Sequence, residues 1–127
     1  MTYNILLAED NQDDRFLTKL ALKETNINAN IIEARNGEIA LNLINKLKDE
    51  KSLPDLIIMD INLPAINGLE ILKQIKSTRT NIPVVILTSS DSEDDKRFCI
   101  ENGAKLLLKK PNNISELKTI VSLVFSC

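Results

Sequence analysis

Four short, uninterrupted apolar runs constrain the fold of this chain more than any other feature. Each run stops at polar side chains: Ile5–Ala8 at Glu9 and Asp10, Leu56–Met59 at Asp60, Val84–Leu87 at Thr88, and Leu106–Leu108 at Lys109 and Lys110. Short continuous apolar runs are typical of strands buried on both faces of a parallel sheet. Sites in such sheets form at the carboxyl ends of the strands. We therefore expect these polar side chains to meet at one edge of the sheet.

Helical patterns alternate with the predicted strands. The segment Ile31–Ala34 predicts one more short strand. A capping box of Ser90 and Glu93 predicts the start of one helix, and Asn102-Gly103 predicts its end. Apolar residues recur at helical spacing in four other segments: Phe16, Leu17, Leu20 and Ala21; Ala40, Leu43, Ile44 and Leu47; Leu69, Leu72 and Ile75; and Ile114, Leu117, Val121 and Val124.

Strict alternation of strands and helices is typical of a parallel sheet with helices on both faces. Right-handed crossovers leave few topologies. We predict an α/β fold, a doubly wound five-stranded parallel sheet of order 2-1-3-4-5, which is the flavodoxin-like (βα)5 arrangement. The switch point then lies between the first and third strands, beside Glu9, Asp10 and Asp60.

Length, composition and charge exclude several classes of protein. The 127 residues fit one compact domain, and 43% of them are apolar, enough for a core. The net charge is −2, Lys and Arg are scattered, and the aromatics are one tyrosine and three phenylalanines, so we expect no nucleic-acid partner. No signal peptide or membrane-length apolar run occurs, so we expect a soluble, cytoplasmic protein with no membrane partner.

The rare residues narrow the chemistry further. Histidine is absent, which excludes Ser-His and Cys-His catalysis and leaves oxygen ligands for any cation, favouring Mg²⁺, Ca²⁺ or Mn²⁺ over Zn²⁺. Gly37, Gly68 and Gly103 stand alone, so the chain has neither a P-loop nor a dinucleotide fingerprint. Cys99 and Cys127 lack metal-ligand spacing, and we interpret them as a helix cysteine and a free terminal cysteine.

Three negative charges at one edge require neutralisation. Glu9, Asp10 and Asp60 would repel one another, because two unit charges about 4 Å apart cost roughly 4 kcal/mol at an effective dielectric of about 20. One divalent cation and Lys110 together would offset them, and Mg²⁺ suits such a ligand set. Asp60 ends a strongly apolar strand and can attack phosphorus as a nucleophile. Lys110 and the Thr88 hydroxyl would then bind other phosphoryl oxygens.

Each of these elements also has a purely structural interpretation. The acidic pair, together with Asn11, Asp13 and Asp14, could form a solvated acidic turn. Asp60 could cap its turn, Thr88 and its neighbours could cap a helix, and the two lysines could lie on the surface. Their joint occurrence at the ends of consecutive core strands favours a shared site.

With these residues, the chain resembles the receiver domain of two-component response regulators over essentially its whole length. The matching stretches are LLAED, DLIIMDINLPAINGLEIL, PVVILTSS, and the GA…KKP segment that ends at Pro111. The resemblance implies that Asp60 is the phosphoacceptor and that Glu9 and Asp10 hold Mg²⁺. It also implies that Asn62 offers its backbone carbonyl to the same cation. The sequence motif LP…NGLE…L also resembles that of stand-alone regulators partnered with bacterial phytochromes.

The resemblance extends to the fourth and fifth strands. Thr88 corresponds to the switch hydroxyl, and Lys110, directly before Pro111, corresponds to the family's lysine, whose bond to proline is usually cis. We expect Lys109 to point the other way. The family often has Tyr or Phe three residues before the lysine, where this chain has Leu107, so the aromatic half of the usual switch is missing.

The implied function is that of a single receiver domain, residues 1–127, without an output domain. It would accept a phosphoryl group from a histidine kinase or a histidine phosphotransfer protein, and it would catalyse only its own phosphorylation and dephosphorylation. The signal would leave through the face formed by the fourth helix, fifth strand and fifth helix. There Ile120, Leu123 and Phe125 could contact a downstream protein or a second copy of the chain.

Three other classes remain open at this stage. A haloacid dehalogenase type phosphatase would need an acid two residues after Asp60, where this chain has Asn62. A receiver-like interaction module that is never phosphorylated is disfavoured by the intact set of site residues, which are Glu9, Asp10, Asp60, Thr88 and Lys110. A flavodoxin-like flavin carrier is disfavoured by the lack of a phosphate loop and of tryptophan.

Overall fold

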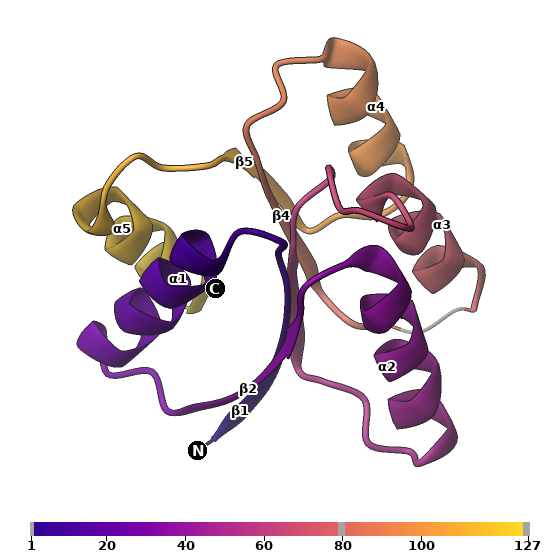
Figure 1. Cartoon of the computed structure of the whole chain (residues 1–127), viewed down its shortest axis with the longest axis horizontal. Helices are drawn as coiled ribbons and strands as arrows, with labels where there is room; N and C mark the ends of the chain where they lie inside the picture. The colour runs from indigo at the N-terminus through magenta and orange to yellow at the C-terminus, as the bar shows by residue number, and fades with distance from the viewer. Residues whose placement is uncertain (1, 79–80, 126–127) are drawn as a thin grey trace.

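Five parallel strands and five helices alternate over residues 2–78 and 81–125, the part of the chain that this computed structural model describes (Figure 1). The sheet order is β2-β1-β3-β4-β5, which confirms the predicted doubly wound topology. The strands are β1 (Tyr3–Ala8), β2 (Ala29–Ala34), β3 (Leu56–Met59), β4 (Val84–Thr88) and β5 (Leu106–Lys109). The helices are α1 (Gln12–Glu24), α2 (Gly37–Asp49), α3 (Gly68–Ser77), α4 (Glu93–Glu101) and α5 (Ile114–Phe125).

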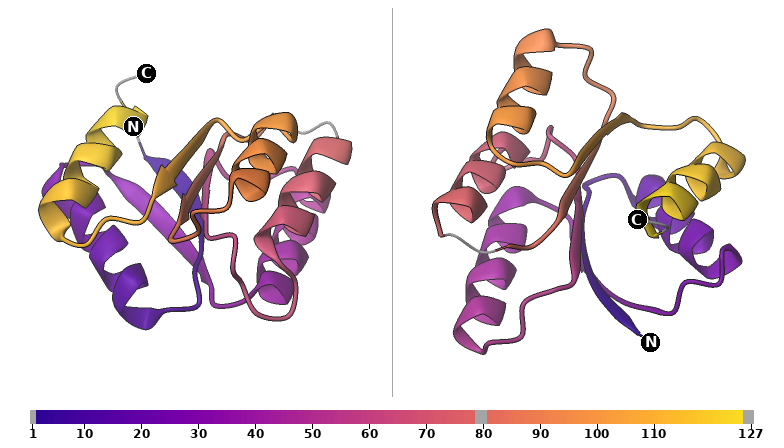
Figure 2. Two further views of the ribbon diagram at one scale, coloured as in Figure 1. Left: turned by 90° about the horizontal axis from the view of Figure 1, so that it is seen from above. Right: turned by 180° about the vertical axis from the view of Figure 1, so that it is seen from behind.

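The helices cover both faces of the sheet (Figures 1 and 2). Helices α1 and α5 pack together on one face, and α2, α3 and α4 cover the other. Successive strand residues point to opposite faces. Leu6 and Ile57 therefore enter the core beneath α2–α4, whereas Ile5 and Ile58 enter the core beneath α1 and α5. Burial on both faces explains why the strands read as continuous apolar runs.

Asparagine side chains start three of the helices at the carboxyl edge of the sheet. Asn11 Oδ1 accepts a hydrogen bond from the backbone N–H of Asp14 at 2.9 Å, and Asn36 Oδ1 accepts one from Ile39 at 2.8 Å. Asn67 caps α3 in a similar way, by accepting from the Leu69 N–H. These caps satisfy amide groups that the first helical turn leaves without partners.

The start of α4 differs from the predicted capping box. The N-cap is Ser92, not Ser90, and its Oγ accepts from the Asp95 N–H at 3.2 Å. Ser90 precedes the cap, and its hydroxyl instead donates to Asp95 Oδ2 at 2.9 Å and accepts from the Ser92 N–H. The predicted end at Asn102-Gly103 is confirmed, with Gly103 at φ +83°.

The loop after β3 packs tightly against the helices beside it. The Gly68 N–H donates to the Ile61 carbonyl at 2.7 Å, and a Cβ at Gly68 would lie only 2.3 Å from the backbone oxygen of Asp60. The Gly37 N–H donates to the Pro64 carbonyl at 2.9 Å, and a Cβ there would lie 1.7 Å from the Ile66 oxygen. Only glycine fits at either position, so this loop is held closely against α2 and α3.

Two further sequence predictions concern helices. Cys99 is a buried free cysteine in α4, as predicted, whereas Cys127 lies outside the described residues. Across residues 2–78 and 81–125, every helix is too short or too polar to cross a membrane.

The close approach at Gly68 gives a test of the fold. A Gly68→Ala variant must shift backbone that holds Asp60, so we expect the free energy of unfolding in urea to fall by about 1–3 kcal/mol. Glu70→Ala, on the exposed side of the same helical turn, should change stability by less than about 0.5 kcal/mol. Equal stability of the two variants would contradict the tight packing of this loop.

Candidate functional site

The carboxyl ends of β1, β3, β4 and β5 bring the predicted polar residues to one edge of the sheet. Glu9 and Asp60 follow β1 and β3 directly, and the two strands are paired with Ala8 opposite Met59. Thr88 is the last residue of β4, and Lys110 follows β5. Glu9 and Asp60 are only 5% and 6% exposed, so their carboxylates need partners inside the protein.

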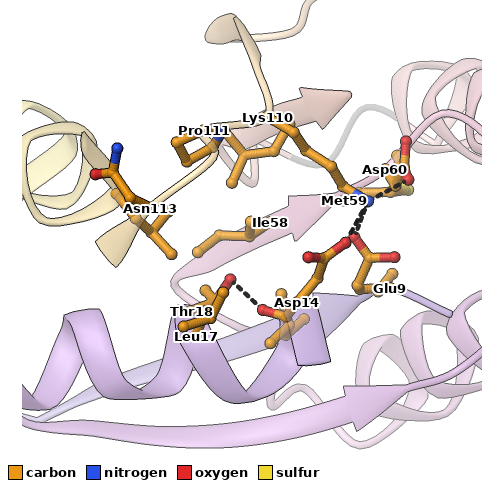
Figure 3. A pocket seen from close by; sticks show the side chains of 14 residues that line it. Glu9, Asp14, Leu17, Thr18, Ile58, Met59, Asp60, Lys110, Pro111 and Asn113 are labelled. Carbon is orange, nitrogen blue, oxygen red and sulfur yellow. Dashed lines mark hydrogen bonds and ion pairs between the residues drawn. The ribbon is translucent and has the colours of Figure 1, made fainter. Parts of the chain in front are cut away.

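Lys110 supplies the cation that these buried carboxylates need. Its Nζ lies 2.5 Å from Glu9 Oε1, 2.9 Å from Asp60 Oδ2 and 3.0 Å from Asp14 Oδ2 (Figure 3). Its backbone N–H donates to the Thr88 carbonyl at 2.8 Å, which fixes the chain just beyond β5. The ammonium group is thus held among three carboxylates by the end of the sheet.

Burial and hydrogen bonding at this site shift the pKa values of Lys110 and Glu9. Burial lowers the pKa of Lys110, but hydrogen bonds to Glu9, Asp60 and Asp14 outweigh this effect and raise the pKa above its ordinary value. Burial raises the pKa of Glu9, although the hydrogen bonds from Lys110 and the Asn11 N–H oppose the rise. Lys110 therefore stays charged at neutral pH.

Lys109 points away from this site, as predicted. Its Nζ lies 2.9 Å from Asp91 Oδ1 on the surface, and its side chain is 67% exposed. The hydrogen bond from Lys109 lowers the pKa of Asp91. Of the two lysines at the end of β5, only Lys110 contacts the buried carboxylates.

Glu9, Asp10 and Asp60 form an acidic cluster. One carboxylate oxygen from each lies within 4.8 Å of the others, and Asp10 is exposed while the other two are buried. Three carboxylates, open to solvent on one side, fit a hard divalent cation that also keeps water ligands. The Asn62 N–H donates to Asp60 Oδ1 at 3.2 Å, so Asn62 lies beside the cluster, and its predicted carbonyl ligand stays a prediction.

Thr88 is buried, 3% exposed, and its hydroxyl accepts a hydrogen bond from the Ser90 N–H at 3.2 Å. Leu107, in the position where the family often has Tyr or Phe, packs against the core beneath α2–α4. The bond between Lys110 and Pro111, which the resemblance implied to be cis, is trans; the described residues contain no cis peptide bond. The trans form is the preferred one even before proline, by about 0.5–1 kcal/mol.

Arg15 is a site residue that the sequence analysis missed. Its Nη1 donates to the backbone oxygens of Glu9 at 2.8 Å and Asp10 at 3.2 Å, and its Nε pairs with Glu33 Oε1 at 3.3 Å. The guanidinium group thereby fixes the backbone that carries the acidic pair. No motif distinguishes this arginine, because its partners are backbone atoms and Glu33, a residue on β2.

Asp14 was also missed, since it was grouped with the acidic turn after β1. Its helical phase was the available signal: Asp14 lies four residues before Thr18 and seven before Ala21, both of which α1 buries. It therefore faces the sheet, where a narrow cavity between α1 and α5 opens toward Lys110 (Figure 3).

Comparison with known proteins identifies relatives over most of the chain. The family model of the response regulator receiver domain matches residues 5–122. The probable methanogenesis regulatory protein FilR2 of Methanothrix harundinacea is 36% identical over 120 residues, which cover 92% of this chain and 77% of FilR2. Response regulator Rcp1 of Synechocystis is 35% identical over 121 residues, covering 92% of this chain and 82% of Rcp1. Of the longer Bacillus subtilis regulatory protein PhoP, the match covers 49%.

Solved structures of two such proteins have the same fold. The phosphorylated cyanobacterial phytochrome response regulator RcpA matches with a TM-score of 0.87 and 34% identity, covering 98% of this chain and 91% of RcpA. The Mn²⁺-bound form of Rcp1 matches with a TM-score of 0.82 and 35% identity, covering 98% of this chain and 92% of Rcp1. The predicted likeness to phytochrome response regulators is thus confirmed.

The charge balance at Lys110 can be tested by stability. In buffer without divalent cations, Lys110→Met leaves Glu9 and Asp60 buried without their cation, and we expect the free energy of unfolding to fall by about 2–4 kcal/mol near pH 7. Lys109→Met removes an exposed ion pair and should cost less than about 1 kcal/mol. Comparable losses would mean that the ammonium of Lys110 does little to stabilise the buried carboxylates.

The difference in the free energy of unfolding between Lys110→Met and Lys109→Met should also depend on pH. The pKa of Glu9 already exceeds its ordinary value of 4.5 because of burial, and the loss of Lys110 raises it further. A raised folded-state pKa favours the protonated form in the folded protein, so stability is retained below pH 4.5 and lost as the pH rises through the folded-state pKa. Urea unfolding should show that this difference in the free energy of unfolding increases from about pH 4.5 to about pH 7.

Proposed function

The chain belongs to the response regulator receiver family, and we propose that Asp60 accepts a phosphoryl group from a histidine of another protein, either a sensor kinase or a phosphotransfer protein. Residues 1–127 contain no histidine, so the donor histidine lies outside them. The observation that carries this proposal is the contact of 2.9 Å between the buried Asp60 carboxylate and Lys110, beside the acidic cluster. A nucleophile, a fixed ammonium and a cation site are the groups that phosphoryl transfer requires.

The transfer step needs no oxidant or reductant. One oxygen of the Asp60 carboxylate attacks phosphorus, the O–P bond forms, and the P–N bond to the donor histidine breaks with its electron pair returning to the imidazole. Lys110 binds a phosphoryl oxygen, and the Thr88 hydroxyl donates to another. In hydrolysis, water attacks phosphorus, the O–P bond breaks, and inorganic phosphate leaves the restored carboxylate. The protein thus acts on its own phosphoryl group and not on a separate substrate.

We propose Mg²⁺ as the cation, held by Glu9, Asp10, Asp60 and the backbone carbonyl of Asn62. The ion would withdraw negative charge from the phosphoryl oxygens when bound. The oxygen-only ligand set and the Mn²⁺-bound form of the related Rcp1 support a hard divalent cation.

The signal is proposed to leave through the face of α4, β5 and α5, by contact with a downstream protein or a second copy of the chain, in the cytoplasm. Phosphorylation adds roughly −1.5 to −2 charge next to Thr88 and Lys110, where this face begins. A groove between α4 and β5 exposes Ile100 (70% exposed) beside Lys96 and Lys109. On α5, Leu123 is exposed, whereas Ile120 and Phe125 are partly buried, with Phe125 packed edge-on against Tyr3.

The role of Asp60 is tested by phosphorylation with radiolabelled acetyl phosphate and Mg²⁺, or with a phosphorylated histidine kinase. Asp60→Asn removes the nucleophile, so we expect labelling to fall to background. Asp55→Asn, at the opposite end of β3, carries the same charge change and should be labelled like the wild type. Full labelling of the Asp60→Asn protein, or no acyl phosphate on the wild type, would exclude the proposal and favour an unphosphorylated interaction module.

The cation site is tested by isothermal titration of Mg²⁺. Asp10→Asn removes one of three clustered carboxylates, and we expect the affinity for Mg²⁺ to fall by about tenfold or more. Asp13→Asn makes the same charge change in the exposed first turn of α1 and should have little effect. Equal effects would indicate a diffuse electrostatic attraction instead of a defined ligand set.

A further inference from the structure

The ammonium group of Lys110 has no donor to spare. It carries three N–H donors, and its Nζ contacts three carboxylates: Glu9 at 2.5 Å, Asp60 at 2.9 Å and Asp14 at 3.0 Å. A phosphoryl oxygen that binds Lys110 must therefore displace one of these contacts or share a donor with it.

The three carboxylates differ in what else they can bind. Glu9 and Asp60 belong to the acidic cluster with Asp10, and oxygens that ligate a cation there are no longer available to Lys110. Asp14 is not part of the acidic cluster found among the described residues, and its side chain is 39% exposed. Asp14 can therefore keep its bond to Lys110 while the cluster binds a cation.

The backbone of α1 holds Asp14 in this position. Its N–H donates to Asn11 Oδ1 at 2.9 Å, and its carbonyl accepts from the hydroxyl of the buried Thr18 at 2.9 Å. Figure 3 shows the Asp14 side chain on α1 reaching toward the Lys110 side chain from the opposite wall of the cavity. The ion pair thereby joins the start of α1 to the end of β5.

We propose that Asp14 is a positioning residue that competes with the phosphoryl group on Asp60 for Lys110. The inference rests on the function proposed above. The negative charge of Asp14 draws the ammonium toward α1, and it also repels the phosphoryl oxygens across the same site. Asp14 therefore weakens the hold of Lys110 on the phosphoryl group.

The test uses the full chain with Mg²⁺ and beryllofluoride, a non-covalent mimic of a phosphoryl group on a carboxylate. Asp14→Asn keeps the side-chain shape and removes the charge, and Asp13→Asn is the matched control on the exposed side of the same turn. By isothermal titration we expect Asp14→Asn to bind beryllofluoride roughly 3- to 10-fold more tightly than Asp13→Asn. Asp14→Glu, which restores the charge, should return the affinity to the wild-type value.

A second measurement reports on the ion pair without Mg²⁺ or beryllofluoride. The ¹⁵N signal of the Lys110 ammonium should move in Asp14→Asn and stay in place in Asp13→Asn, which a general loss of stability would not produce. If wild-type protein failed to bind beryllofluoride, the proposed function would be wrong. If wild-type protein bound it, but Asp14→Asn bound no more tightly than Asp13→Asn or left the Lys110 signal unmoved, only the role of Asp14 would be wrong.

Discussion

The burial of two carboxylates beside one ammonium group is the constraint on which the rest of this site depends. Glu9 and Asp60 are almost inaccessible to solvent, and a buried charge is tolerated only with a partner. Lys110 meets both, but a single positive charge cannot balance Glu9, Asp10, Asp14 and Asp60 together. The site therefore retains an excess of negative charge, and this excess gives it affinity for a divalent cation.

The parallel topology of the sheet places these charged groups together. β3 lies between β1 and β4, so Asp60, which directly follows β3, stands between the acidic pair and the hydroxyl of Thr88. The Lys110 N–H bonds to the Thr88 carbonyl, so the sheet ladder itself sets the distance from the lysine backbone to the site. Helices α1, α2 and α3 are capped by asparagine at the same edge, and Gly68 lets α3 approach the Asp60 backbone closely. The scaffold thus fixes the side chains before any ligand binds.

Most of the fold and of the candidate site can be predicted from the sequence. Apolar runs reveal strands buried on both faces, and parallel strands place their carboxyl ends together. The rule for strand ends predicts the meeting of Glu9, Asp10 and Asp60, and right-handed crossovers in a doubly wound sheet predict the strand order. The choice of Lys110 over Lys109 comes from the resemblance to receiver domains, in which the lysine directly precedes a proline. The sequence does not reveal Arg15, whose partners are backbone oxygens, or the choice of Ser92 over Ser90 as the cap of α4, where the Ser90 hydroxyl instead bonds to Asp95. Asp14 required attention to helical phase and not to composition, since Asp13 beside it has the same charge and faces solvent.

The replacement of the usual aromatic residue by Leu107 changes how a signal at Thr88 can travel. A leucine packed into the core beneath α2–α4 has no ring to rotate into a space vacated by the threonine. The hydrogen bonds of the loop after β4 offer another connection, since Thr88 Oγ accepts from the Ser90 N–H, and Ser90 Oγ donates to Asp95 in the first turn of α4. A hydroxyl can donate to a phosphoryl oxygen while it still accepts a bond, so Thr88 can remain attached to Ser90 as it turns toward Asp60. If Thr88 moves as the proposed function requires, it would pull α4 through Ser90 and Asp95, a chain of hydrogen bonds that contains no aromatic residue.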